Sequence, residues 1–382
     1  MNQPEDSYDC ILIGGGLAGL CSAISLRLAG FQILLLEKNH YPKHKVCGEY
    51  VSKEVTPYLQ FLGINMQELK AKALDKLHFS TQKGLETQIP LPMGGWGISR
   101  YALDLTLYNR ALELGVKVAQ DEVTDIHFEN NQFQISTKSN KVYFSKTAIG
   151  THGKRSKLDQ TLQRSFISNR SAYMAVKRHV ELDFPEDVVG LHNFDGGYCG
   201  VSKVETNAVN ICYISSFKSF QHYKNIAAFE EKVVAANPIL KTIFSDKKEC
   251  WEKPLVISQI SFETKECVVN HALMAGDAAG MIHPLSGNGM GMAIRSAQLA
   301  SNETIQFLKG ITTRSEMERK YTKAWKRNFL WRLRAGRIIS GVFRIDWLAD
   351  RLLRLLRRHP ALLILIIKST HGKLMKGNID GN

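Results

Sequence analysis

A glycine-rich segment near the N-terminus, residues 14–19 (Gly-Gly-Gly-Leu-Ala-Gly), has the spacing G-x-G-x-x-G. In such a motif Gly14 permits a tight turn, Gly16 lets the backbone approach a pyrophosphate, and Gly19 allows a helix to pack closely on a strand. Glu37 follows 18 residues after Gly19, where a carboxylate can accept hydrogen bonds from ribose hydroxyls. The residue types and their spacing therefore predict a dinucleotide site.

The elements around this motif are those that a dinucleotide site requires. Residues 8–13 form an apolar run typical of a buried parallel strand, residues 17–29 have helical spacing, and residues 31–36 form a second apolar run. This order predicts a β-α-β unit. The start of its helix would present free N–H groups and a positive dipole to the phosphates.

A second segment, residues 273–291, favours FAD over NAD. An apolar strand ends there in Gly276-Asp277, and a glycine-rich stretch over residues 287–291 begins another helix. Asp277 could contact a ribityl hydroxyl, and the helix start could direct N–H groups at the N1/C2=O edge of a flavin, which becomes negative on reduction. No second strand-linked G-x-G-x-x-G and no C-x-x-C pair occurs. We therefore expect a transient electron donor, either NAD(P)H or a ferredoxin-like protein.

Four stretches in order resemble the geranylgeranyl reductase family, within the flavoprotein superfamily typified by p-hydroxybenzoate hydroxylase. They are the first glycine motif, residues 45–49 (Lys-Val-Cys-Gly-Glu), Ser99-Arg100 with Asp104 and Leu107, and the Gly276-Asp277 segment. The resemblance implies that Arg100 contacts the FAD phosphate region and that Cys47 and Gly48 lie beside the flavin ring. A buried cysteine is also a common small apolar core residue, so Cys47 fits either role.

The motifs and the resemblance together give two sets of candidate site residues. The candidates for a catalytic acid are Cys47, Glu49 and Tyr198. The cofactor-binding set is Gly14, Gly16, Leu17, Ala18, Gly19, Glu37, Lys38, Cys47, Gly48, Arg100, Val123, Asp277, Gly287, Gly289 and Met290. No metal site is predicted, because Pro42 between His40 and His44 makes a helical pair of ligands improbable.

The chain departs from the family pattern in two places. His152 stands in a Thr-His-Gly stretch where the superfamily usually has an acidic residue, which leaves nicotinamide use open. Residues 197–202 keep the tyrosine of the family's substrate motif, Tyr198, but have no proline, and the paired tryptophans of flavin halogenases are absent there. The substrate is therefore left open.

The predicted fold is α/β, with a Rossmann-like FAD-binding domain that is discontinuous in sequence, an inserted β-rich substrate domain and a helical C-terminal region. The FAD-binding domain takes residues 1–75, 98–165 and 265–310, the substrate domain 76–97 and 166–264, and the basic helical region 311–382. Residues 122–149 alternate polar and apolar side chains around two turns, which predicts a three-stranded antiparallel meander.

The net charge of +14 is concentrated at the C-terminus of the 382-residue chain. Residues 310–382 hold 17 Lys and Arg against 5 Asp and Glu. A helical wheel of residues 343–358 places Arg344, Arg351, Arg354 and Arg358 on one face. The opposite face carries Ile345, Leu348, Leu352, Leu355 and Leu356. This pattern fits an anchor on an anionic membrane surface, and it equally fits a helical cap packed on the enzyme body. No recognition motif supports nucleic-acid binding.

The leading interpretation is an FAD-dependent reductase that transfers hydride to a C=C bond of an apolar prenyl or polyene lipid. The alternatives are an FAD-dependent monooxygenase that hydroxylates or epoxidises its substrate, and a non-catalytic lipid-binding or escort protein on the same fold. The composition, with 44% apolar and 23% charged residues, argues against a disordered chain. We expect a cytoplasmic location, possible peripheral membrane contact, and an apolar small-molecule or lipid substrate.

Overall fold

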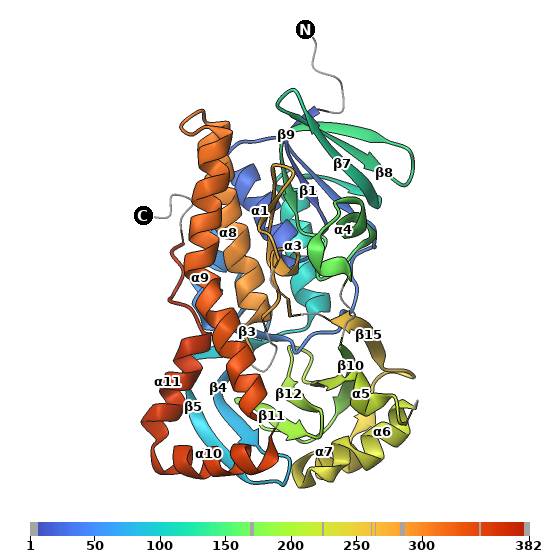
Figure 1. Cartoon of the computed structure of the whole chain (residues 1–382), viewed down its shortest axis with the longest axis vertical. Coiled ribbons are helices and arrows are strands. Elements are labelled where there is room, and N and C mark those ends of the chain that lie inside the picture. Colours follow the sequence, from blue (N-terminus) through green and yellow to red (C-terminus); the bar gives the residue numbers. More distant parts are fainter. Residues whose placement is uncertain are drawn as a thin grey trace.

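The computed structural model describes residues 7–168, 172–223, 225–260, 262–263, 265–282, 287–343 and 345–377. The chain forms two β-sheets with helices around them, and the α/β fold class predicted from the sequence is confirmed (Figure 1). Among the described residues, no helix combines the length and the apolar character that crossing a membrane requires.

The first sheet is built around β1 (Ser7–Ile13), an almost wholly buried strand. Its strands have the order β16-β17-β9-β1-β2-β6, and β7 and β8 extend it beyond β9. The other strands of this sheet are β2 (Ile33–Glu37), β6 (Lys117–Gln120), β7 (Val123–Glu129), β8 (Gln132–Thr137), β9 (Val142–Gly150), β16 (Val268–Val269) and β17 (Ala272–Met274). The predicted meander is confirmed, because β7, β8 and β9 pair antiparallel in succession.

Strands β1, β2, β6, β9 and β17 run parallel, which brings their carboxyl ends to one edge of the sheet. The predicted β-α-β unit is confirmed by α1 (Leu17–Leu28), which connects β1 to β2. α1 packs against α3 (Arg100–Glu113) and α8 (Gly289–Leu308), and these helices share one apolar core with the sheet. Residues far apart in the sequence, near 14 and 277, therefore meet at this edge.

The second sheet has the order β14-β10-β13-β12-β11-β4-β5-β3, with β15 beside β10. Its strands are β3 (Tyr50–Ser52), β4 (Lys72–Ser80), β5 (Glu86–Gly97), β10 (Tyr173–Glu181), β11 (Val188–Phe194), β12 (Gly197–Lys203), β13 (Val209–Ser216), β14 (Lys248–Glu249) and β15 (Leu255–Ile260). Residues 1–75 thus supply strands to both sheets, since β3 pairs with β5.

Short helices complete the body. α6 (Ile226–Lys232) and α7 (Pro238–Asp246) pack on one face of the second sheet through a separate apolar core that includes Phe229 and Leu240. The remaining short helices are η1 (Lys53–Val55), α2 (Thr56–Phe61), α4 (Lys157–Thr161), η2 (Ser165–Ser168), α5 (Phe217–Phe220), η3 (Val234–Ala236) and η4 (Gly276–Ala278). Residues 217–236 thus contain three short helices, α5, α6 and η3.

The C-terminal region forms α9 (Arg314–Phe343), α10 (Asp346–Arg358) and α11 (Pro360–Thr370). α9 packs along α8, and α10 and α11 cover β4 and β5 at the end of the molecule opposite β7 and β8 (Figure 1). Leu353, Leu356 and Leu363 are buried against that sheet, as in a helical cap. The predicted apolar face is partly wrong, because Leu355 is 49% exposed. α9 ends at Phe343 and α10 begins at Asp346, and α10 runs in a different direction from α9 (Figure 1).

Candidate functional site

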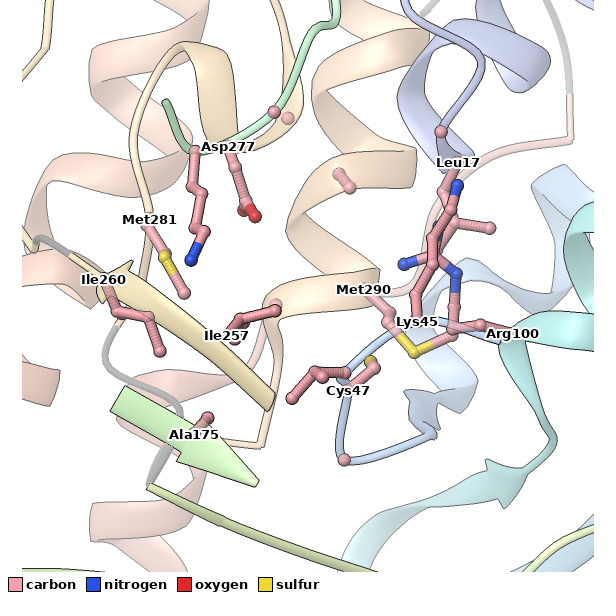
Figure 2. A pocket seen from close by; sticks show the side chains of 18 of the residues that line it. Leu17, Lys45, Cys47, Arg100, Ala175, Ile257, Ile260, Asp277, Met281 and Met290 are labelled. Carbon is pink, nitrogen blue, oxygen red and sulfur yellow. The ribbon is translucent and has the colours of Figure 1, made fainter. Parts of the chain in front are cut away.

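A cavity of about 770 Å³ opens at the carboxyl edge of the parallel strands, with walls from both sheets. Every residue of the predicted cofactor-binding set except Gly19 lines it, and so do the three catalytic candidates Cys47, Glu49 and Tyr198. In Figure 2, Leu17, Lys45 and Arg100 lie together on one side, while Ala175, Ile257, Ile260 and Met281 lie on the other. The cavity therefore has a polar part and an apolar part.

The three motif glycines occupy the positions that their spacing predicts. Gly14 has a φ of +107°, and a Cβ there would lie 2.6 Å from the carbonyl oxygen of Thr151. A Cβ on Gly19 would overlap the Gly14 carbonyl and lie 2.8 Å from Oγ1 of Thr151, so Gly19 serves packing and does not line the cavity. Nothing lies within 4 Å of a Cβ on Gly16. That open space faces the place a pyrophosphate would take.

The carboxylate of Glu37 is held at the end of β2. One oxygen accepts from the backbone N–H of Gly15 at 2.7 Å, and the other accepts from the backbone N–H of Asn39 at 2.9 Å and from its side-chain amide at 2.6 Å. These bonds fix the orientation of the carboxylate beside the motif. Carboxylate oxygens have several acceptor sites, so Glu37 can also accept from ribose hydroxyls.

Two helices begin at the cavity without a side-chain cap. The N-cap of α1 is Gly16 and the N-cap of α8 is Asn288, and neither side chain caps its helix. The first N–H groups of a helix have no partner within the helix and carry its positive dipole. The two helix starts therefore provide free N–H groups, one near the motif glycines and one near Gly287, Gly289 and Met290.

Arg100 is placed at the first turn of α3 by the N-cap Ser99, whose hydroxyl accepts from the N–H of Ala102. Its guanidinium donates two hydrogen bonds of 2.7 Å to Asp104, and Lys45 donates to the same carboxylate at 2.8 Å. Burial alone would raise the pKa of Asp104, but the charges of Arg100 and Lys45 outweigh it and lower that pKa. Asp104 thus orients two cations on the polar wall.

Asp277 lies at the turn after β17, across the cavity from Arg100 (Figure 2). Burial raises the pKa of this carboxyl, and the charges of Lys265, Arg100 and Lys154 act against the shift. Burial also lowers the pKa of Lys154 and of Lys265 to about 8 in each case. Lys154 lines the cavity, and Lys265 donates to the backbone carbonyl of Asp277 at 2.8 Å. These contacts hold the turn in place.

Glu49 is the centre of a buried ionic cluster beside the cavity. Its carboxylate accepts from the ammonium of Lys177, from Nε2 of His179 at 2.6 Å, and from the backbone N–H of Arg100 at 2.8 Å. Burial favours a raised pKa, yet the bonds and charges of His179 and Lys177 outweigh it, so the pKa of Glu49 is lowered. Glu49 has a φ of +53°, a strained conformation of the kind that clusters at functional sites.

Histidine and tryptophan rings surround this cluster. His179 stacks on Trp251 with ring centroids 4.6 Å apart, and His44 lies 4.6 Å from the same indole. His44, Glu49 and His179 bring potential metal-ligand atoms within 4.8 Å of one another. The ammonium of Lys177 already neutralises Glu49, so we interpret the group as an ion-pair network.

Cys47 and Tyr198 are both protonated at neutral pH. Burial raises the pKa of the Cys47 thiol, and it raises the pKa of the Tyr198 phenol well above its ordinary value. Cys47 lies below Asp277 in Figure 2, between the polar and apolar parts of the cavity. Tyr198 comes from β12 and belongs to the apolar part, with Ala175 and Ile214.

His152, which stands where the family usually has an acidic residue, lines the cavity and contacts Asp159. Its Nε2 lies 3.0 Å from the carboxylate of Asp159, whose pKa is lowered to about 2. Burial alone would raise that pKa, and the hydrogen bond and charge of His152 lead the effects that lower it. Nδ1 of His152 is buried with no hydrogen-bond partner. With the proton of a neutral imidazole on Nε2, Nδ1 is an acceptor, so a ligand that offers a hydrogen-bond donor would satisfy this nitrogen.

Sequence reasoning missed Lys177 and His179 as members of the site. A signal was present, because Lys177, Arg178 and His179 interrupt an otherwise apolar strand, and all three are buried in β10. Buried charges need partners, so such a run predicts an ionic network without telling where the partners lie. Lys177 and His179 lie beside Glu49 because β10 runs next to the loop that precedes β3.

The polar part of the cavity fits FAD. Two uncapped helix starts, the open space at Gly16, the oriented carboxylate of Glu37 and the unpartnered Nδ1 of His152 together offer the donors and acceptors of a dinucleotide site. Gly14, Gly16 and the start of α1 would hold the pyrophosphate with Arg100 nearby, Glu37 the ribose, and Asp277 with the start of α8 the flavin end.

Comparison with known proteins agrees with this assignment. A digeranylgeranylglycerophospholipid reductase of Methanosarcina acetivorans is 23% identical over 345 residues, which cover 84% of this chain and 81% of the reductase. A flavin-dependent halogenase of Armillaria mellea is 23% identical over 355 residues, which cover 81% of this chain and 69% of the halogenase.

Among solved structures, a flavin-dependent brominase superposes with a TM-score of 0.77 at 18% identity, covering 95% of this chain and 93% of the brominase. At this identity the superposition shows a shared fold. The sequence profile of the FAD binding domain family matches residues 7–327. This match spans most of the chain and includes the cavity's polar wall, so the chain belongs to the FAD binding domain family of flavoproteins and its cofactor is FAD.

Proposed function

We propose that the protein is an FAD-dependent reductase that hydrogenates a C=C bond of a prenyl or polyene lipid. The proposal rests on the side of the cavity that is lined by residues of the second sheet. This wall contains no charged side chain among the described residues; its members are Tyr50, Leu77, Leu91, Ala175, Val189, Leu191, Tyr198, Gly200, Val201, Cys212, Tyr213, Ile214, Leu255, Val256, Ile257 and Ile260. An uncharged wall suits an aliphatic chain and leaves a charged or strongly polar substrate without partners.

The residues at the junction of the two parts fit a hydrogenation. Hydrogenation would need a hydride on one carbon of the double bond, which bound and reduced FAD would supply, and a proton on the other carbon. Cys47 and Tyr198 keep their protons at neutral pH, because burial raises the pKa of each. Glu49 is held as an anion by Lys177 and His179, so it is a poor proton donor and a good orienting group. We therefore assign proton donation to Cys47 or Tyr198.

Two features support a reductase over a halogenase or a monooxygenase. The stretch Lys45-Val46-Cys47-Gly48-Glu49, which resembles the reductase family, lies at the junction of the two parts of the cavity. No tryptophan from the described residues lines the cavity, and Trp96, within the Gly-Gly-Trp-Gly stretch, instead donates to Thr56. The halogenase of Armillaria mellea and the reductase of Methanosarcina acetivorans are equally similar to this chain in sequence, so the preference for a reductase rests on these two features.

The decisive experiment is a single turnover without oxygen. The FAD-loaded protein is photoreduced anaerobically and mixed with a prenyl lipid or a polyene, and the flavin absorbance and product mass are followed. We expect oxidation of the flavin with a product heavier by two hydrogens. A product that forms only after oxygen is admitted, heavier by one oxygen or, with added halide, by a halogen, would refute the reductase assignment.

Matched variants identify the proton donor. Cys47→Ser and Tyr198→Phe each retain most of the side-chain volume, and loss of a positioned acid slows the step by about 10²–10⁴-fold. Cys267→Ser is the control, since Cys267 is buried in the FAD-binding core and does not line the cavity. If both test variants react as fast as the control, neither residue donates the proton.

A further inference from the structure

The C-terminal helices expose an unusual amount of apolar surface. Nine of the fourteen large apolar side chains exposed in the described part of the chain lie within residues 311–374. They are Ile311, Trp331, Ile338, Ile345, Trp347, Leu355, Leu362, Leu365 and Leu374. Single exposed apolar residues are normal, but a concentration in one region marks a surface that something else covers.

α11 shows this most clearly, because residues 361–367, nearly two turns of the helix, are all apolar. Its inner side packs on the second sheet through the buried Leu363 and the half-buried Ile366 and Ile367. Its outer side presents Leu362, 46% exposed, and Leu365, 63% exposed. A helix that is apolar all round is normally buried on every side, in a protein core or in lipid. The body covers one side of α11 only.

The same surface is strongly basic. Residues 327–377 contain twelve Lys and Arg and only two acidic residues, Asp346 and Asp350. On α10 the exposed face carries Trp347, Arg351, Leu355 and Arg358, which follow one another at spacings of three and four residues. Apolar and cationic side chains are therefore mixed on one face, which suits an anionic layer with an apolar interior.

We propose that α10, α11 and the C-terminal end of α9 form a docking surface for a bilayer of anionic phospholipids. Arg351, Arg354 and Arg358 would contact headgroup phosphates, while Trp347 and Leu365 would enter the boundary between headgroups and acyl chains. An acidic protein or a nucleic acid would match the charge and would leave the outer leucines of α11 exposed. An anionic bilayer covers both kinds of side chain.

One helix of the docking surface, α11, also borders the cavity. Ile367, Thr370 and His371, from α11 and the residue after it, line the cavity on the inner side of the helix whose outer side carries Leu362 and Leu365. A bilayer docked on the outer side of α11 would therefore be separated from the cavity by this one helix, which is a short path for a lipid that leaves the bilayer. This step rests on the proposed reductase function, whereas the docking surface itself does not.

Vesicle flotation of the full-length, FAD-loaded protein tests the surface without any turnover. The vesicles are phosphatidylcholine alone, or phosphatidylcholine mixed with phosphatidylglycerol. One double variant, Leu362→Gln with Leu365→Gln, removes the apolar contacts, and another, Arg354→Gln with Arg358→Gln, removes two charges. The control, Lys138→Gln with Lys141→Gln, changes two exposed lysines in the turn between β8 and β9, at the opposite end of the molecule.

We expect the wild type and the control to float with the anionic vesicles and to be released by salt. Each arginine removed should weaken partitioning about fivefold, and the leucine variant should weaken it as well. Flavin content of each variant verifies the fold. Tryptophan fluorescence of the wild type should shift to the blue on vesicle addition. No flotation, equal flotation of all variants, or binding only to an acidic protein such as a carrier protein would overturn the proposal.

Discussion

Replacing Glu49 by glutamine tests how the ionic cluster beside the cavity is held together. The side chains of Glu49 and Lys177 are both 0% exposed. The ammonium of Lys177 donates to Glu49 and to the backbone carbonyl of Lys45, and within the described part of the chain it bonds no second carboxylate. Glu49→Gln keeps the volume and leaves the ammonium without a counter-charge. Removing one partner of a buried ion pair costs about 3–5 kcal/mol, so the free energy of unfolding should fall by that amount.

Urea unfolding followed by circular dichroism measures the change, and a double-mutant cycle isolates the pair. Glu49→Gln with Lys177→Met removes both charges, so it should be more stable than the sum of the single variants implies, by about 2 kcal/mol or more. Asp187→Asn is the matched control, because the pair of Lys76 and Asp187 is 49% and 43% exposed. An exposed pair contributes about 0–1 kcal/mol.

Two results would refute this reasoning. A cost for Glu49→Gln as small as that of the exposed control would show that water or structural relaxation compensates the charge of Lys177. Strict additivity in the cycle would show that Glu49 and Lys177 contribute independently. In either case the assignment of Glu49 as an anion that orients its neighbours would be wrong.

Other parts of the site and one pH dependence give further tests. Gly16→Ala should weaken FAD binding about tenfold in a flavin fluorescence titration with no loss of apoprotein stability, because nothing lies within 4 Å of the new Cβ. Gly14→Ala should also lower the melting temperature, since its φ is +107°. Gly200→Val should retain FAD but weaken binding of a prenyl lipid in a competition assay, because its Cβ fits at 3.6 Å from the Cys212 carbonyl while its methyl groups narrow the cavity. The lowered pKa of Glu49 makes its stabilising contribution complete above the ordinary value of 4.5 and lost as pH falls through the folded-state pKa. Glu49→Gln should therefore make melting temperatures less sensitive to acid, and an unchanged acid profile would contradict this.

Much of the cofactor site could be predicted from the sequence because its requirements are local. The turn at Gly14, the start of α1 and the strand that ends at Glu37 are set by residues within about thirty positions of one another. The segment at Gly276-Asp277 could be added because parallel strands end at one edge of a sheet. The meander of β7 to β9 was predictable for the same reason, since alternation and turns are short-range signals.

The rest was decided by tertiary structure, because it depends on contacts between distant residues. Only the fold brings Lys177 and His179 to Glu49, more than a hundred positions earlier, and only the second sheet makes the uncharged wall from strands scattered over residues 72–260. The helical wheel of residues 343–358 predicted an amphipathic helix. It could not predict which side of the helix faces the body, because packing against β4 and β5 decides the orientation. The sequence by itself determined an FAD site. The tertiary structure decided what surrounds it, because charge pairing and burial act through space and not along the chain.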